Sequence, residues 1–217
     1  ALLIDVFAVG GGGSGGLSIG GSSNSDLAAG SGGGGGYTTT QKSIYLEKDK
    51  SYNIVIGNGG DAPHGASYES KSGYDGNNGG TTSGFNITAN GGYGGKKRGY
   101  YTNPASSRGG NGGSGGGAGG RYETAGSGEG FSNGSGGVDG GNGTDAKDTN
   151  KKYGIGQGTT TREFGEVGST LYSNGGRGGY GTPGVITNGS SNTGNAGSGG
   201  TYVHIKSGST YTTEEKA

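Results

Sequence analysis

The sequence predicts a mostly irregular, all-β fold: a bundle of packed polyglycine II helices with a small antiparallel β-sheet and essentially no α-helix. Glycine supplies 63 of the 217 residues and proline only 3, a ratio that excludes collagen. The glycines lie in tracts that keep a three-residue register, as at positions 110, 113, 116 and 119. Three residues per turn is the period of the polyproline II helix. No stretch has the apolar period typical of an amphipathic helix.

Composition also indicates what must hold such a fold together. Hydrophobic residues make up only 24% of the chain, which is typical of disorder, but disordered chains usually carry a high net charge and this one carries none. Ordering the 63 glycines costs on the order of 100 kcal/mol of backbone entropy. A small apolar core cannot offset that cost, so dense backbone hydrogen bonding and close packing are expected to do so.

The N-terminal part combines an apolar run with glycine tracts. Leu2–Val9 is nearly continuous in strand-forming residues, which predicts a buried strand. It leads directly into the tract Gly10–Gly16. A polar loop, Leu17–Ala29, then connects to a second tract, Gly30–Gly36.

Ordinary β-structure is expected at two further places. Ser43–Gly57 has two alternating runs around Lys48–Ser51, which predicts a β-hairpin. Thr201–Lys206 alternates in the same way and predicts one more strand. We expect these strands to form one small antiparallel sheet with the N-terminal strand. The predicted organisation is one glycine-rich bundle domain over residues 1–206, followed by a flexible C-terminal tail over residues 207–217.

The middle of the chain separates smooth tracts from decorated loops. The longest tract, Gly109–Gly120, is expected to run straight through the bundle, a length of about 37 Å at the polyproline II rise. Its glycine ridge should pack closely, so valine should be far more damaging at Gly113 or Gly116 than at Asn111 or Ser114. The loops between tracts, here called connectors, carry nearly all the Tyr, Arg, Lys and His residues.

Seven segments follow one another in a distinctive order along nearly the whole chain. They are VFAVGGGGSGG (Val6–Gly16), GGGGGYTTT (Gly32–Thr40), YNIVIGNGG (Tyr52–Gly60), GGNGGSGGGAGG (Gly109–Gly120), GQGTTTREFGE (Gly156–Glu166), LYSNGGRGG (Leu171–Gly179) and GSGGTYVHIK (Gly197–Lys206). In this order they resemble the glycine-rich domains of bacteriophage and prophage tail and minor structural proteins. The resemblance implies a bundle of polyglycine II helices whose distal loops contact a receptor on the host.

The connectors supply the candidate receptor-binding residues. The connector 93–103 (YGGKKRGYYTN) brackets three adjacent cations with tyrosines, and tyrosine gives a large contact area at low entropy cost. The alternative for this loop is a solvated charged surface. Similar, weaker signals occur in 61–75, 121–123 and 145–153. The candidates are Tyr93, Lys96, Lys97, Arg98, Tyr100, Tyr101, His64, Tyr68, Tyr74, Arg121 and Tyr122.

The sequence offers little for catalysis, metals or cofactors. The chain has no cysteine and only two histidines, and we expect no enzyme, no metal and no cofactor. Two RGG triplets, at Arg108 and Arg177, leave RNA binding as a remote alternative, and GGNGTD at Gly140–Asp145 does the same for calcium. The zero net charge gives no reason to expect nucleic acid binding, and the apolar runs are too short for membrane insertion.

The resulting functional hypothesis is a non-enzymatic phage tail-fibre or tail-tip domain that displays loops on a rigid scaffold. Its expected partners are a bacterial surface receptor, either glycan or protein, and other tail proteins, and its expected location is the virion, outside the cell. The alternatives are a purely structural virion spacer and a non-phage extracellular glycine-rich protein of the ice-binding or matrix type.

Overall fold

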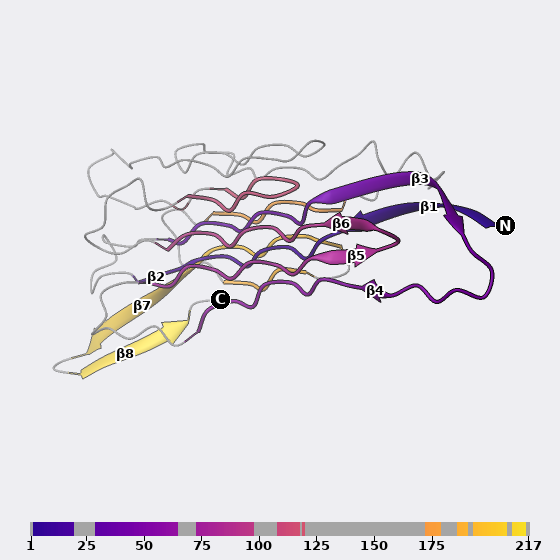
Figure 1. Ribbon diagram of the computed structural model, residues 1–217. Helices are drawn as coiled ribbons and strands as arrows, with labels where there is room; N and C mark the ends of the chain where they lie inside the picture. Colours follow the sequence, from indigo (N-terminus) through magenta and orange to yellow (C-terminus); the bar gives the residue numbers. More distant parts are fainter. Residues whose placement is uncertain are drawn as a thin grey trace.

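The computed structural model shows long, undulating segments that run side by side, with short strands at both ends (Figure 1). The part of the chain that the structure describes comprises residues 2–19, 29–64, 73–97, 108–117, 119, 172–178, 186–190, 193–207 and 210–215. No helix occurs within these residues, which confirms the predicted mostly irregular, all-β class. The strands are β1 (Leu2–Val9), β2 (Leu17–Ile19), β3 (Thr38–Leu46), β4 (Ile54–Val55), β5 (Thr82–Gly84), β6 (Ile87–Ala89), β7 (Gly200–Ser207) and β8 (Thr210–Glu215).

The strands form three separate sheets, so the prediction of one small sheet is wrong. β1 pairs antiparallel with β3, β4 and β6 flank β5 in an antiparallel sheet, and β7 lies between β2 and β8. β7 is parallel to β2 and antiparallel to β8. Figure 1 places β1 and β3 at one end of the bundle and β7 and β8 at the other. The bundle between these ends keeps the two groups of strands apart.

The hairpin predicted over Ser43–Gly57 does not form. β3 and β4 are consecutive, but β3 pairs with β1, while β4 pairs with β5 from another part of the chain. The alternating pattern of each run correctly predicted a strand. The partner of each strand, however, depends on the position in the bundle of the glycine segment next to it in the sequence. Lys48 and Asp49 form a turn, as expected, within a loop that links two different sheets.

The two terminal strands also differ from expectation. β1 was predicted to be buried, yet Leu2 and Leu3 are 60% and 62% exposed because the β1–β3 ribbon extends beyond the bundle. At the other terminus, β7 confirms the strand predicted over Thr201–Lys206. Part of the expected tail forms β8, whose three Thr residues and one Tyr are residue types enriched in strands.

The segment Gly10–Leu17, here called the central segment, shows how the bundle is held together. The amides of Gly10, Gly13 and Gly16 donate to carbonyls of the segment 31–37. The amides at 11, 14 and 17 donate to the segment 74–80, and those at 12 and 15 donate to the segment 187–190. Its carbonyls accept from residues 60, 92, 95 and 197, so six other segments surround it.

The hydrogen-bond partners of the central segment therefore repeat every three residues, which is the period that the glycine register predicts. The segment 31–37 repeats the pattern, because its successive amides donate in rotation to the segments 90–96, 114–117 and 194–197. The assignment of these segments to polyglycine II helices stays a prediction. What the structure establishes is a lattice in which each segment donates sideways rather than to itself.

Glycine is needed in this lattice because neighbouring backbones leave no space for a side chain. A Cβ added at Gly11, Gly13 or Gly34 would lie closer than 3.0 Å to a carbonyl oxygen of another segment, and real Cβ atoms essentially never come that close. Conformational freedom is not the reason: among the described glycines only Gly194 has a left-handed backbone, with φ of 66°.

The tract Gly109–Gly120 does not run straight through the bundle as predicted. The chain bends at Gly112–Ser114, and the Gly116 amide then donates to the Gly110 carbonyl. Both limbs lie against the segment 31–37, whose amides donate to Ser114 and Gly117 and whose carbonyls accept from Gly110 and Gly113. The tract therefore returns to the end of the bundle from which it came.

Small apolar clusters close the lattice at both ends. Ala8, Ile87 and Ala89 form one cluster beside β1 and β6, and Leu17, Ala62 and Ile186 form another beside β2. Between the two clusters, most buried positions are glycine or carry a small hydroxyl side chain, as at the fully buried Ser14, Ser31 and Ser114. The core therefore consists mainly of hydrogen-bonded backbone.

Candidate functional site

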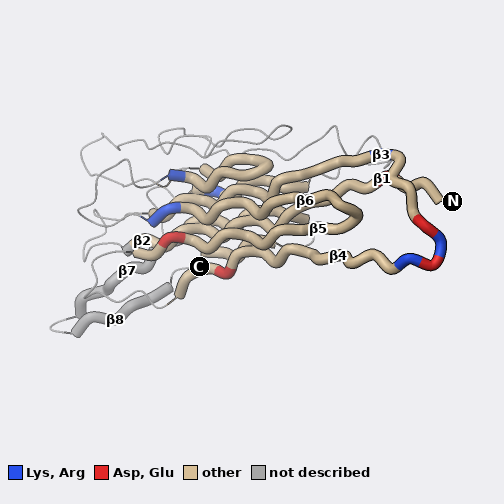
Figure 2. The backbone as a smooth tube through the Cα atoms, in the orientation of Figure 1, with Lys and Arg blue, Asp and Glu red and all other residues tan. Residues whose placement is uncertain are grey.

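Charged residues occupy the two ends of the bundle rather than its middle in the view of Figure 2. One group lies on the loop between β3 and β4, and the other lies where the segments 73–80, 90–97 and 108–117 end. We call the first the sheet end and the second the connector end. The predicted site residues belong to the connectors, so this end is considered first.

Two connectors meet at the connector end through Asp75. Its Oδ2 lies 2.9 Å from the Lys96 Nζ, and its Oδ1 accepts a hydrogen bond from the Lys97 amide, also at 2.9 Å. The Lys96 amide donates to the Arg108 carbonyl at 3.0 Å. Asp75, at the end of the connector 61–75, is therefore held beside Lys96 and Lys97 of the connector 93–103.

Five of the predicted site residues lie within the described part of the chain. Tyr74 is 41% exposed, and its backbone forms a two-way hydrogen-bonded bridge with Leu17. Lys96 is exposed, Lys97 is half-buried, and His64 is exposed one residue after the half-buried Pro63. The other predicted residues, Arg98, Tyr100, Tyr101, Tyr68, Arg121 and Tyr122, lie outside the described residues.

Tyr93 belongs to the bundle rather than to a connector. Its amide donates to Asn111 and its carbonyl accepts from Gly34, so its backbone is fixed by two neighbouring segments. Its side chain is 53% exposed, and the three residues to Lys96 correspond to about 9 Å along the segment. Burial, and then the neighbouring Tyr93, raise the pKa of Tyr37.

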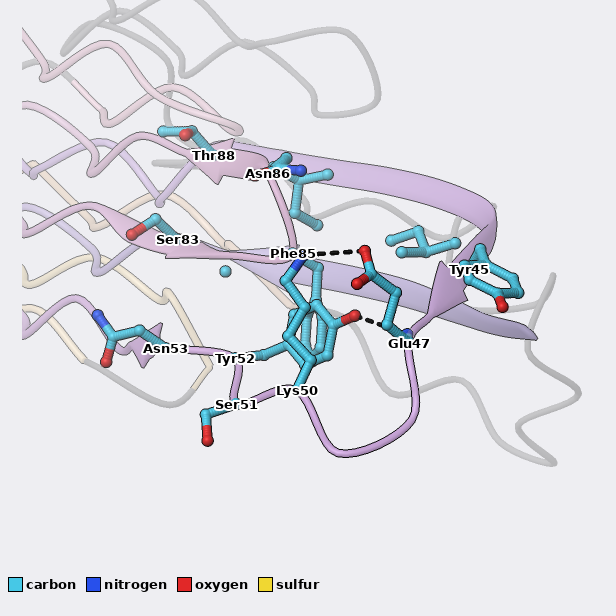
Figure 3. Close-up of a pocket in the computed structure, with 13 residues that line it drawn as sticks. Tyr45, Glu47, Lys50, Ser51, Tyr52, Asn53, Ser83, Phe85, Asn86 and Thr88 are labelled. Carbon is cyan, nitrogen blue, oxygen red and sulfur yellow. Dashed lines mark hydrogen bonds and ion pairs between the residues drawn. The ribbon is translucent and has the colours of Figure 1, made fainter. Parts of the chain in front are cut away.

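The sheet end contains a groove that sequence reasoning missed. It has a volume of about 610 Å³ and lies between the β3–β4 loop and the turn that joins β5 to β6 (Figure 3). Its lining combines aromatic side chains with amides, hydroxyls and one ion pair. The lining residues are Ile44, Tyr45, Glu47, Lys50, Ser51, Tyr52, Asn53, Ser83, Gly84, Phe85, Asn86, Ile87 and Thr88.

Tyr52 is the fixed centre of this groove. Its ring packs against Phe85 with centroids 5.5 Å apart, and the Lys50 Nζ lies 5.7 Å from the same ring. Its hydroxyl oxygen accepts a hydrogen bond of 2.8 Å from the Glu47 amide. Figure 3 shows these side chains stacked together, with Tyr45 on the far side of Glu47.

The charges in the groove neutralise each other. The Lys50 Nζ donates to the Glu47 carboxylate at 2.9 Å, and this hydrogen bond raises the pKa of Lys50. Lys50 therefore stays protonated across the physiological range and keeps its partner. The groove thus presents aromatic surface and neutral hydrogen-bonding groups, with no unbalanced charge among its lining residues.

The turn from β5 to β6 has an unusual sequence for its conformation. Phe85 and Asn86 both have left-handed backbones, with φ of 51° and 64°. Two-residue hairpin turns with two such residues strongly favour Asn-Gly, and a bulky residue in this region is an outlier. The signal available in the sequence was the run TSG-FN-ITA at 82–89, which lacks the usual glycine and so was not recognised as a turn.

The described residues contain no group of His, Cys, Asp and Glu that could hold a metal ion. Nor do they include a helix with the length and hydropathy needed to cross a membrane.

Comparison with known proteins identifies the family of the chain. A search of curated proteins found none that matches the chain. The family described as glycine-rich domain matches residues 1–214, and the protein therefore belongs to the glycine-rich domain family.

Proposed function

We propose that this chain is a non-enzymatic domain of a bacteriophage tail fibre or tail tip, located on the virion outside the cell. In this proposal the connectors recognise a glycan or protein receptor on the bacterial surface, and other tail proteins are the remaining partners. The setting rests on the resemblance to phage tail and minor structural proteins. The role in recognition rests on the arrangement of the connector end.

The observation that supports recognition is the junction at Asp75. Two connectors distant in sequence are held side by side there, so that Tyr74, Lys96 and Lys97 lie on neighbouring segments. The Tyr74 backbone hydrogen-bonds to Leu17, the Lys96 backbone to Ser31 and Arg108, and the Lys97 amide to the Asp75 carboxylate. Tyrosine and basic side chains on such a fixed surface are typical of binding residues.

Rigid display gives this arrangement a thermodynamic advantage. Ordering loops and side chains at an interface costs free energy, and a surface ordered in advance avoids part of that cost. The lattice fixes the segment 90–97 through amides of Gly92, Tyr93 and Gly95 that donate to other segments. Binding would then require ordering only of the side chains along this segment.

The test is adsorption of the purified domain to bacterial cells. A fluorescently labelled domain is mixed with a panel of strains, and the proposal expects saturable binding to some of them and competition with phage adsorption. The variant Lys96→Ala/Lys97→Ala, with and without Tyr74→Ala, should lose binding. The charge-matched control Lys42→Ala/Lys48→Ala, which changes residues at the sheet end, should retain it.

Two outcomes would contradict the proposal. A wild-type domain that binds no strain would favour the structural spacer. Binding that survives the connector variants and is lost in the control would move recognition away from the connector end. Circular dichroism of each variant confirms that the lattice is intact before binding is compared.

A further inference from the structure

We propose that the groove at the sheet end is a second binding site, which takes a short uncharged saccharide. Its walls are the β3–β4 loop and the Phe85–Asn86 turn. This inference goes beyond the proposed function, which places recognition on the connectors at the opposite end. It stands even if the connectors bind nothing.

The first argument is that the groove is built before any ligand arrives. Tyr52 is fixed by Phe85 on its ring and by the Glu47 amide on its hydroxyl oxygen. The Thr39 hydroxyl donates to the Thr88 carbonyl at 2.8 Å, which ties β3 to β6. The two walls are thus linked to each other, and the volume of about 610 Å³ falls within the range of ligand pockets.

The second argument is the backbone of the turn. Phe85 and Asn86 hold left-handed conformations that glycine would adopt at lower cost. Backbone strain of this kind is concentrated at ligand-binding sites, where the contribution of the side chain to binding outweighs the free-energy cost of the strained backbone. Here the strained pair contributes an aromatic ring and an amide to the groove lining.

The third argument is the chemistry of the lining. The axial C–H groups of a sugar ring pack against the electron-rich face of an aromatic ring. Tyr45 offers such a ring, since it is 57% exposed and lines the groove. Sugar hydroxyls both donate and accept, and the Asn53 and Asn86 amides and the Ser51 hydroxyl do the same.

The ligand should carry no charge, because the two charged side chains of the groove already form an ion pair with each other. Glu47 and Lys50 satisfy each other at 2.9 Å, so a charged sugar would have to compete with this pair. The lining surface is more polar than apolar, which offers an apolar peptide anchor little surface to bury. An uncharged saccharide uses both kinds of surface at once.

The experiment is a nuclear magnetic resonance titration of the full isotope-labelled chain. The probes are neutral di- and trisaccharides built from glucose, galactose, N-acetylglucosamine or rhamnose, with sialyllactose as the charged comparison and acetyl-Gly-Ser-Thr-Gly-amide as the peptide comparison. The proposal expects saturable amide shifts at residues 45–53 and 83–88 with at least one neutral sugar. Neither comparison probe should shift these residues as strongly.

Three variants separate binding from folding. Tyr45→Ala should weaken binding by about tenfold or more, as for a central aromatic contact. Asn86→Gly should also weaken binding without lowering the melting temperature, since it removes the amide and relieves the backbone. Ile56→Ala is the matched control, because Ile56 is 55% exposed and does not line the groove.

Any of four results would overturn the inference. These are no shift with any neutral sugar, shifts confined to residues outside the groove, equal or stronger shifts with sialyllactose or the peptide, and unchanged binding by both Tyr45→Ala and Asn86→Gly. Cell adsorption by the connectors is measured separately, so either proposal can fail alone.

Discussion

The central segment and the β1–β3 ribbon are adjacent in sequence yet hold together in different ways. Residues Gly10–Leu17 are all buried, and their amides alternate among three neighbouring segments. The two strands of the ribbon lie before and after this segment in the sequence. In them, Leu2, Leu3 and Tyr45 are more than half exposed. The lattice is stabilised by backbone contacts that exclude side chains, while the sheet end leaves its side chains accessible. One chain thus separates a part packed through its backbone from parts whose side chains are open to solvent.

The largest predicted loss of stability comes from adding a single side chain inside the lattice. A Cβ at Gly116 would lie closer than 3.0 Å to the carbonyl oxygens of Gly32 and Gly33, which are backbone atoms and cannot rotate away. We expect Gly116→Val to cost more than about 4 kcal/mol of unfolding free energy, the range reserved for severe overpacking or loss of hydrogen bonds. Thermal and denaturant unfolding followed by circular dichroism measures it.

The control for this substitution is Asn111→Val in the same tract. Asn111 is exposed, so the valine side chain meets solvent and the cost should stay within about 1 kcal/mol. Ser114 was grouped with Asn111 from the sequence, but it is fully buried, so Ser114→Val should resemble the glycine variant. Equal tolerance at Gly116 and Asn111 would contradict a packed lattice.

Removing a buried hydroxyl should lower the unfolding free energy less than adding a side chain inside the lattice, but more than changing an exposed group. The Ser14 hydroxyl donates to the Asp61 carbonyl and accepts from the Asn77 amide, each at 2.9 Å. Ser14→Ala leaves the Asn77 amide unpaired, whereas the Asp61 carbonyl keeps a hydrogen bond from the Asn77 side chain; the loss should cost about 1–3 kcal/mol. Chemical denaturation measures the loss, and Ser51→Ala, at an exposed position, is the control. A loss no greater than that of the control would show that neither hydrogen bond contributes.

The same contrast explains what the sequence could predict. The three-residue register of the glycines matches the period with which the hydrogen-bond partners change, because each third of a segment faces a different neighbour. It did not predict the bend at Gly112–Ser114, since a glycine tract looks the same whether it continues or turns back. Nor could it pair β4 with β5, because that choice depends on which segments become neighbours in the lattice.

The candidate sites follow the same division. The connectors were visible because tyrosine and basic residues stand out against glycine, and the contact at Asp75 brought two of them together. The groove was not visible because its aromatic residues, Tyr45, Tyr52 and Phe85, come from two distant stretches. Only the fold shows that the Phe85–Asn86 turn faces the β3–β4 loop.

The turn at the sheet end gives a prediction of opposite sign. Asn86 has φ of 64°, a conformation that glycine adopts without a Cβ penalty. Asn86→Gly should therefore be neutral or stabilise the fold by less than about 1 kcal/mol, because the relieved Cβ penalty is partly offset by the greater backbone entropy of glycine in the unfolded chain. Differential scanning calorimetry measures the shift. A clear loss of stability would mean that the Asn86 side chain, rather than the backbone, holds the turn.

The smallest expected effect concerns the ion pair at the connector end. Lys96 and Asp75 are 52% and 44% exposed in their side chains, and exposed pairs contribute at most about 1 kcal/mol. Asp75→Asn retains an oxygen that can accept from the Lys97 amide and removes only the charge. A double-mutant cycle with Lys96→Gln, measured at low and high salt, isolates the pair and should give a coupling that weakens as salt rises. A coupling well above 1 kcal/mol that salt does not change would mean that the connector end is shielded from solvent, and this end would then resemble the lattice rather than a surface open to a receptor.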